Sequence, residues 1–505
     1  MKATRHFRFS TQLLYLCITS LIIGVVVTLW NVHVLHIMQK LHMETHHAVE
    51  VYEPLSFVKR NTPVYWIHAQ NIQTGYLDHV MAVFDRIGYI KGGHNSDWDV
   101  LWSHDYPFTE LREKISKIRP HQKVNHIPGS GFITNKVTLV LSDIEYIPKA
   151  FQMPQQKSLF KQYILDHPEK LWVQKSSNHR GIRVKNVEAL DLRMENTFVQ
   201  EFVQDPLLVD GKKFDIGVYT VVTSVSPLRV YYYSGDMLIR YCGKKYDKTN
   251  FDDVNTYVVT DDYTPTWKMP SLHQYYTDMK FTHKETLYAH IKSRGLDSSK
   301  VDKQIEDAIQ KVFLSKLPQL QQSLEKYQHK NIFFELTRFD FVLDKDLNLY
   351  LMEVNMSPNL STGHFSANKL LYEQVIYNTF SLIDVARNIP VSLKSSSEDQ
   401  DLMRVSLRDI QTDAKTCSSE ECNGCQQLEC QLCSRCLTNE VRQFLFESFL
   451  EHLHQRQMKR VYPESLTQEE SIMYQDKLDN ELALNDRLLR KWYRSKCRQE
   501  QSWCF

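Results

Sequence analysis

Three oxygen-bearing side chains, Asp340, Glu353 and Asn355, lie where a β-hairpin would bring them together. Two apolar runs rich in Phe, Val and Leu flank an Asp/Asn cluster, a pattern typical of a hairpin. A turn at the centre of this cluster places Asp340 directly opposite Glu353, and Asn355 shares their face. Two buried carboxylates side by side are costly without a cation between them, and oxygen ligands suit Mg²⁺, which usually also takes nucleotide phosphates. The sequence therefore predicts a magnesium site, and the alternative is a hairpin whose acids face solvent.

Two further segments carry a lysine beside a loop that could approach an anion. The Pro-Gly-Ser-Gly sequence at 128–131 predicts a turn or a nest of backbone amides, and Lys136 then opens a helix. Two strands, 171–175 and 181–187, flank a short polar tip, so this hairpin could fold over phosphates with Lys175 as a point charge. The alternatives are an ordinary glycine-rich loop with a solvated lysine and an ordinary surface hairpin.

The next strands add a possible adenine contact and a second charged face. The strand at 198–203 could pair with an adenine edge through the backbone amide and carbonyl at its end. After a tight turn, Lys213 and Asp215 alternate with apolar residues and therefore share one face of a strand. Arg240 lies just past a later turn. These segments favour the metal-site interpretation of the hairpin.

Length and composition set the class of protein. The 505 residues are enough for two or three domains or one large multi-lobed unit. The chain carries 61 basic and 60 acidic residues, a net charge of +1, so no charge bias indicates a nucleic-acid partner. Apolar residues make up 42% and aromatic residues 11%, which supports a well-packed globular body. Alternating strand and helix patterns after residue 62 predict a mixed fold of helices and strands, in the α/β (α+β) class.

The N-terminal residues predict a membrane anchor. Residues 13–30 carry no charge, and with the apolar residues after them they supply the roughly 20 residues that a spanning helix needs. Three basic residues precede this run and no Lys or Arg follows until Lys40. This asymmetry predicts a cytosolic tail at 1–11 and a transmembrane signal-anchor at 12–37, giving a single-pass type II membrane protein with a polar stalk at 38–60. A cleaved signal peptide and a buried or interfacial helix are the alternatives.

The C-terminal part is rich in cysteine. Six of the ten cysteines lie in a segment at 417–436, after a polar Ser/Asp-rich linker at 391–416. In an oxidising compartment this cluster would form disulfides, whereas in the cytosol its C-x-x-C spacings would suit zinc bound by four thiolates. We favour disulfides. The region at 437–505 is expected to be helical, with a first helix over 441–460.

Taken together, these stretches resemble the tubulin–tyrosine ligase-like family, which includes a tyrosine ligase, glutamylases and glycylases. The motifs occur in the family's order and read NHIPGSG, WVQK…RGI, QEFV, DPLLVDGKKFDI, PLRVY and ELTRFDFVLD…LMEVNMSPN. The resemblance implies an ATP-grasp catalytic region at 61–390, with an N lobe at 61–148, a central lobe at 149–205 and a C lobe at 206–390. The DPLLVDGKKFD phrase leans toward the glutamylase branch.

The resemblance also implies cofactors and a role for each site residue. ATP and Mg²⁺ would be the cofactors, and catalysis would depend on positioning and on charge neutralisation by the metal and by Lys and Arg side chains. The implied catalytic residues are Lys136, Lys213 and Arg240, the implied metal ligands are Asp340, Glu353 and Asn355, and the residues implied to bind ATP are Lys175, Arg180, Gly181, Ile182, Gln200, Glu201, Phe202, Val203, Lys213 and Asp215.

The implied reaction is ATP-dependent amide bond formation. A protein carboxylate attacks the γ-phosphate to give an acyl phosphate, from which an incoming amino group displaces phosphate. Glutamate would be the co-substrate and tubulin the acceptor, as in polyglutamylation of microtubules. The family usually has an arginine where this chain has Gly217, so a nucleotide-binding pseudoenzyme is one alternative. A lumenal orientation would conflict with cytosolic tubulin, which leaves open a non-tubulin lumenal substrate, a cytoplasmic or cytoskeletal location, and a membrane-tethered scaffold.

Overall fold

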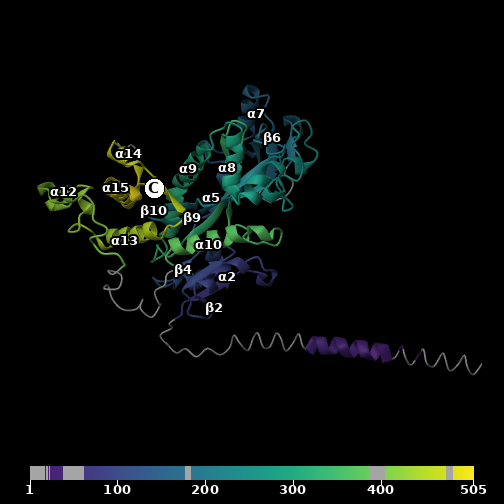
Figure 1. Cartoon of the computed structure of the whole chain (residues 1–505), viewed down its shortest axis with the longest axis horizontal. Coiled ribbons are helices and arrows are strands. Elements are labelled where there is room, and N and C mark those ends of the chain that lie inside the picture. Colours follow the sequence, from purple (N-terminus) through teal and green to yellow (C-terminus); the bar gives the residue numbers. More distant parts are fainter. Residues whose placement is uncertain are drawn as a thin grey trace, which may run out of the picture. The chain divides into compact units, whose positions relative to one another are not determined.

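The computed structural model describes residues 18, 21, 23–37, 62–176, 183–386, 404–473 and 481–505. The chain divides into two units, 1–60 and 61–505 (Figure 1). In the first unit, residues 23–37 form an exposed helix. Across the described ranges, we find no helix that combines the length and the apolar character needed to span a bilayer. The anchor predicted at 12–37 is therefore not confirmed. Residues 12–17, 19, 20 and 22 of that segment lie outside the described residues, as do the predicted tail and stalk.

The N lobe is a parallel sheet with helical crossovers, as its alternating pattern predicts. Helix α2 (Asp78–Arg86) connects the first two strands and buries Val80, Val83 and Phe84, since parallel neighbours need a crossover connection. Short helices α3 (Pro107–Glu110) and α4 (Arg112–Ser116) follow the third strand. The strands lie in the order β2 (Ile90–Gly92), β1 (Val64–His68), β3 (Val100–Ser103) and β4 (Lys123–Val124).

The central lobe is an antiparallel sheet with one helix against it. Helix α7 (Lys157–Asp166) packs on the sheet, and Phe160 and Trp172 form the centre of its small core. The tip of the predicted phosphate-covering hairpin, 177–182, lies outside the described residues. The strands lie in the order β5 (Ala150–Met153), β8 (Thr197–Glu201), β6 (Trp172–Ser176) and β7 (Arg183–Lys185).

The C lobe is built on the long strand β9 (Phe214–Val225). One side of β9 pairs with β13 (Glu335–Leu343), which in turn pairs with β14 (Leu349–Met356). The other side pairs first with β11 (Leu238–Tyr241) and then with β10 (Leu228–Tyr233). The short strand β12 (Thr264–Pro265) extends the sheet beyond β11. Three antiparallel partners therefore hold β9 in a fixed register along its length.

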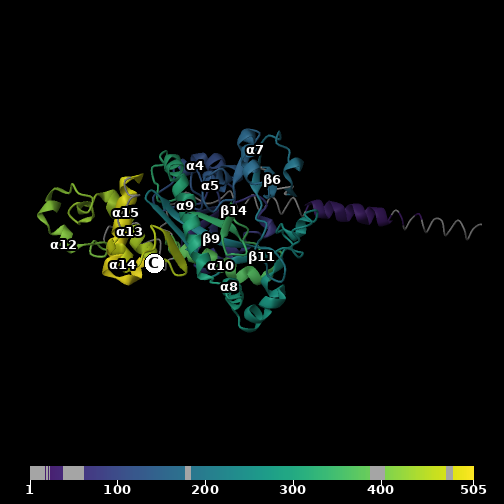
Figure 2. The ribbon, with the colours of Figure 1, turned by 90° about the horizontal axis from the view of Figure 1, so that it is seen from above.

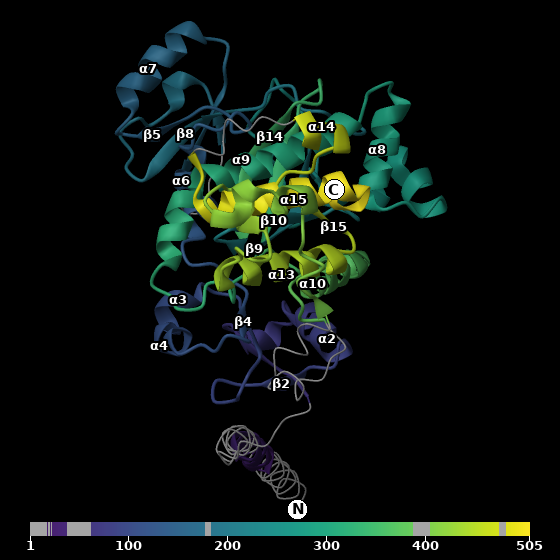
Figure 3. The ribbon, with the colours of Figure 1, turned by 90° about the vertical axis from the view of Figure 1, so that its left-hand side faces the viewer.

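Helices cover both faces of this sheet. Side chains on a strand alternate between faces, and Ile216, Val218 and Val222 pack in one core with α9 (Ser299–Leu324). The opposite face packs Tyr219 and Val221 against α10 (Lys369–Leu382), so the two helices flank β9 and β10 in Figure 3. Helix α8 (His283–Ser293) begins at a capping box and contacts β11. By the same alternation, positions 215 and 217 lie on the face that α10 partly covers.

The C-terminal region is joined to the sheet of the C lobe. Helix α13 (Asn439–His454) is followed by β15 (Met458–Tyr462), which pairs antiparallel with β10. The predicted helix over 441–460 is therefore wrong at its end, because the chain there satisfies the open edge of β10. Helices α14 (Gln468–Met473) and α15 (Leu484–Gln499) complete the region, which lies at the opposite end of this unit from α7 (Figure 2).

The cysteines of this region form disulfides. Cys497 pairs with Cys504, and the six cysteines of the Cys-rich segment pair as Cys417–Cys433, Cys422–Cys430 and Cys425–Cys436. The disulfide interpretation is thus the one that the structure supports, and no zinc-type ligand group occurs among the described residues. The short helix α12 (Ala414–Cys417) enters this segment. Val405 and Ile410, from the predicted linker, are buried in one core with α13 and α15, so that part of the linker is packed.

Candidate active site

The predicted hairpin is present, and its strands place the predicted metal ligands together. Asp340 of β13 pairs directly with Glu353 of β14, and Asn355 pairs with Arg338. The pairing changes register just past Asp340, so an irregularity on the β14 side aligns the two acids. The amide nitrogen Nδ2 of Asn355 donates to Asp340 Oδ2 at 2.9 Å and to Glu353 Oε1 at 3.1 Å. An amide and two carboxylates therefore converge on one point.

Two arginines hold the acids at the centre of this face. Arg338 donates its Nε to Asp340 Oδ1 at 2.6 Å and a terminal nitrogen to Oδ2 at 2.8 Å. Arg240 makes the same two-pronged contact with Asp215, at 2.9 and 2.8 Å, and also reaches Asp340 Oδ2 at 3.1 Å. Burial raises the pKa of Asp215, while the charge of Arg240 opposes that rise. The four side chains form one continuous charged network across β11, β9 and β13.

Glu353 is paired with a lysine from the N lobe. Helix α6 (Lys136–Val140) begins at Lys136, as predicted, and Asn135 caps it by accepting from the amides of the following residues. Lys136 Nζ lies 2.7 Å from Glu353 Oε2. Burial alone would raise the pKa of Glu353, but the charge and hydrogen bond of Lys136 outweigh it and lower that pKa to about 2. Glu353 is therefore an anion at neutral pH.

Two more lysines approach the same region from the central and C lobes. Lys175 donates its Nζ to Gln200 Oε1 at 3.0 Å, and Lys213 Nζ lies 4.8 Å from the centre of the Phe202 ring. Burial lowers the pKa of Lys175 to about 8; the charge of Glu353 opposes this shift, and the charges of Lys136 and Lys213 add to it. Burial also lowers the pKa of Lys213, which is only 8% exposed. Each of these ammonium groups lacks a carboxylate ion-pair partner in the described part of the chain and is suited to a polyanion such as a triphosphate.

The predicted adenine segment is placed beside these lysines, with one correction. Gln200 is buried and donates its Nε2 to Pro148 O at 3.2 Å. The backbone amides of Glu201 and Phe202 donate to Lys149 O and Leu171 O, both at 2.9 Å. These two amides are therefore already bonded, and the prediction that the strand end leaves its amides open for adenine does not hold at them. The Glu201 side chain accepts from Tyr163 at 2.8 Å. Val203, which follows Phe202, is half-buried, whereas the predicted ATP residues Arg180, Gly181 and Ile182 lie outside the described residues.

The donor set fits a magnesium ion. Its oxygens come from Asp340, Glu353 and Asn355, and no sulfur or imidazole ligand is near them in the geometry given above. Within the described residues no group of three or more His, Cys, Asp or Glu side chains could hold a metal, so the amide and a nucleotide's phosphates would have to complete the shell. The amide of Asn355 can present its oxygen by a half-turn, because its O and N occupy equivalent positions.

Sequence reasoning missed Arg338. The signal was available, because Arg338 lies two residues before Asp340 in a strand and therefore shares its face. Arg338 is 6% exposed and Asp340 is 2% exposed, so a buried charge there needs a partner. Its position over Gly217 depends on the neighbouring strand and could not be seen in the spacing alone.

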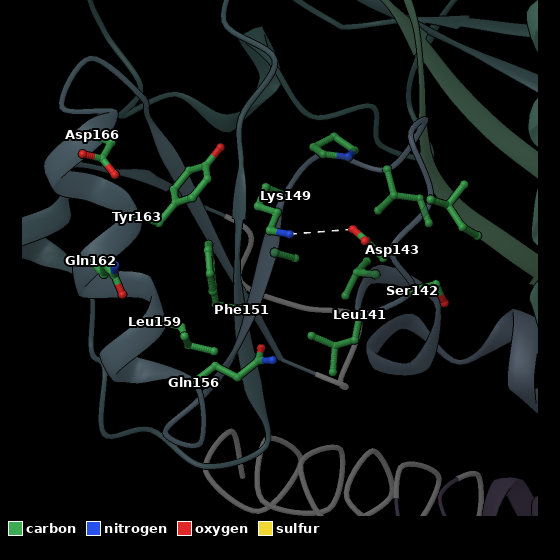
Figure 4. A pocket seen from close by; sticks show the side chains of 15 residues that line it. Leu141, Ser142, Asp143, Lys149, Phe151, Gln156, Leu159, Gln162, Tyr163 and Asp166 are labelled. Carbon is green, nitrogen blue, oxygen red and sulfur yellow. Dashed lines mark ion pairs between the residues drawn. The ribbon is translucent and has the colours of Figure 1, made fainter.

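A separate cavity of about 410 Å³ lies beside the central lobe. Figure 4 shows the side chains of α7 and of the segment after α6 around it, with an ion pair of 3.8 Å between Lys149 and Asp143. Tyr163, which hydrogen-bonds Glu201, also lines it. None of the predicted catalytic, metal or ATP residues lines this cavity, so it is distinct from the charged face.

Known proteins share these features of the sequence. The model of the tubulin-tyrosine ligase family matches residues 114–395. The "Probable tubulin polyglutamylase ttll-15" of Caenorhabditis elegans is 42% identical over 448 residues, which cover 86% of this chain and 85% of that protein. The "Tubulin polyglutamylase TTLL6" of Mus musculus is 25% identical over 66% of this chain and 44% of its own length. The "Tubulin monoglutamylase TTLL4" of Homo sapiens is 28% identical over 53% of this chain and 24% of its own length.

Proposed function

This chain belongs to the tubulin-tyrosine ligase family, and from that premise we propose that it is an ATP- and Mg²⁺-dependent ligase that adds glutamate to a protein carboxylate. The observation that carries the proposal is the convergence of Asp340, Glu353 and Asn355 on one sheet face, with arginines and lysines around them. The relatives' names add glutamylation as the activity and tubulin as the acceptor.

The chain's own residues support each part of this reaction. Lys175 and Lys213 would attract the phosphates of ATP, because both are ammonium groups without a carboxylate partner among the described residues. Bound Mg²⁺ would supply positive charge to the phosphate oxygens. Arg240 lies at the edge of the acid network and would orient the transferred phosphoryl group or the carboxylate that receives it. Charge neutralisation and positioning would then account for the rate, as in other phosphoryl transfers.

Glutamate incorporation tests the proposal. The purified full chain is incubated with tubulin, ATP, Mg²⁺ and labelled glutamate, and label on tubulin is measured. We expect ATP-dependent incorporation that Glu353→Gln removes, because this change deletes an anion held at the centre of the site. The matched control is Glu325→Gln, an exposed acid at the end of α9, which should leave incorporation unchanged. Equal incorporation by Glu353→Gln and the wild type contradicts the proposal.

The disulfides favour a second candidate, a ligase that acts on a protein other than tubulin. Four disulfides persist in oxidising compartments such as the endoplasmic reticulum lumen, whereas tubulin is cytosolic. The catalytic unit would then lie on the lumenal side, as the charge flanks of the N-terminal segment predict. Protease protection of a C-terminal tag in intact vesicles tests this candidate. A protected tag supports a lumenal acceptor, and a digested tag supports tubulin.

A further inference from the structure

Gly217 and Arg338 occupy one space on the charged face. Gly217 pairs with Asp340 across β9 and β13, and Arg338 lies two residues from Asp340 on the same face. A Cβ atom at position 217 would lie 2.8 Å from Arg338 Cδ and 3.1 Å from its Nε. Real Cβ atoms essentially never come within 3.0 Å of a heavy atom outside their own and adjacent residues, so any other residue at 217 would displace this side chain. The arginine therefore depends on the glycine.

The space that Gly217 leaves open lets Arg338 reach the acid. With its aliphatic stem over the glycine, Arg338 places two nitrogens on the two oxygens of Asp340, at 2.6 and 2.8 Å. This two-pronged geometry fixes the plane of the carboxylate as well as its distance. Arg240 and Asn355 then reach the same oxygen, Oδ2, at 3.1 and 2.9 Å. The orientation of Asp340 is thus set mainly by Arg338.

We propose that Arg338 is the positioning residue of Asp340, and that Gly217 and Arg338 form a coupled pair in which the arginine of this site is supplied from β13 instead of β9. The proposal rests on the proposed function, since it assigns a role within the same nucleotide site. Gly217 then does not indicate that the site has lost a fixed positive charge. Position 217 lacks the arginine, but the guanidinium is still present beside Asp340, held from the neighbouring strand.

Loss of Arg338 has two consequences for nucleotide binding. The Asp340 carboxylate loses its only two-pronged contact among the described residues and can rotate away from the point where Asn355 and Glu353 converge. The face also loses one fixed positive charge that would otherwise attract a triphosphate. Both effects weaken binding. The substitution Gly217→Ala should weaken it in the same way, because the added methyl group pushes Arg338 off Asp340.

A double-mutant cycle tests the coupling. Binding of a fluorescent, non-hydrolysable ATP analogue at saturating Mg²⁺ is measured for the full-length wild type, Gly217→Ala, Arg338→Gly and the double variant. We expect each single change to raise the Kd by about tenfold, the scale of a lost charge-assisted hydrogen bond. The double variant should bind no more weakly than Arg338→Gly, because the methyl group then has nothing to displace. Arg193→Gly, at an exposed arginine of the central lobe, is the control and should bind like the wild type.

The cycle has clear outcomes. If the two single effects multiply, the double variant binds the analogue about a hundredfold more weakly than the wild type, and the coupling is overturned. If Arg338→Gly binds the analogue as tightly as the wild type, the positioning role is overturned. If circular dichroism shows that Arg338→Gly is poorly folded, the double variant Gly217→Arg/Arg338→Gly is measured in its place. Binding within a few-fold of the wild type then supports the coupled pair, and weaker binding overturns it. Nucleotide binding needs no acceptor protein. Absence of glutamate transfer by the wild type would therefore count against the proposed function alone.

Discussion

The lowered pKa of Lys175 predicts that nucleotide binding weakens as the solution becomes alkaline. Lys175 donates to Gln200 at 3.0 Å and has no carboxylate partner among the described residues, so burial lowers its pKa to about 8. The charged form is the acid form, and only that form attracts phosphate. Between about pH 7 and about pH 9 the charged fraction falls from about nine-tenths to about one-tenth, which sets an upper limit of about tenfold on the rise in Kd.

The assay and its controls follow from the expected weakening of nucleotide binding with rising pH. Binding of a non-hydrolysable ATP analogue to the full chain is titrated at saturating Mg²⁺ across this pH range. Lys175→Arg keeps its charge throughout, so its binding should depend less on pH than that of the wild type. Lys175→Met should bind weakly at every pH. If the wild type and Lys175→Arg show the same pH profile, Lys175 does not titrate in this range or does not hold phosphate, and the reasoning is refuted.

Three other predictions concern the pairs that hold the site and the C-terminal region. Lys136→Met removes the charge that keeps the pKa of Glu353 at about 2, so nucleotide binding at about pH 5 relative to neutral pH should fall more in this variant than in the wild type. Arg229 and Glu451 form a buried pair at 3.0 Å, so Arg229→Met should cost about 3–5 kcal/mol in urea denaturation, and Arg229→Met/Glu451→Leu should recover most of it. Replacing Cys497 and Cys504 with serine removes a short cross-link and should lower the free energy of unfolding by about 2 kcal/mol in the same assay; an unchanged free energy of unfolding would contradict this prediction.

The site hairpin could be predicted because its signals are local. The apolar runs and the Asp/Asn turn lie within one short stretch, and strand alternation then decides which side chains share a face. The predicted opposition of Asp340 and Glu353 is present in the structure. The same reasoning placed Lys136 at the start of α6.

The features that were missed depend on neighbours far away in the sequence. The strand β15 forms because the edge of β10 is open to it, and the residues of β15 themselves do not indicate that partner. The packing of the Arg338 side chain over Gly217 likewise joins residues from two separate strands. The amides of Glu201 and Phe202 are bonded to β5 and β6 neighbours, which the strand pattern alone could not show. Cysteine spacing could not choose between disulfides and zinc, because both chemistries accept it.

The most direct test of the metal and nucleotide site is a crystal structure of the full chain with Mg²⁺ and a non-hydrolysable ATP analogue. We expect a metal within about 2.1 Å of oxygens from Asp340, Glu353 and Asn355, with the triphosphate beside Lys175 and Lys213. A nucleotide bound elsewhere, with Glu353 still paired only to Lys136, would contradict it.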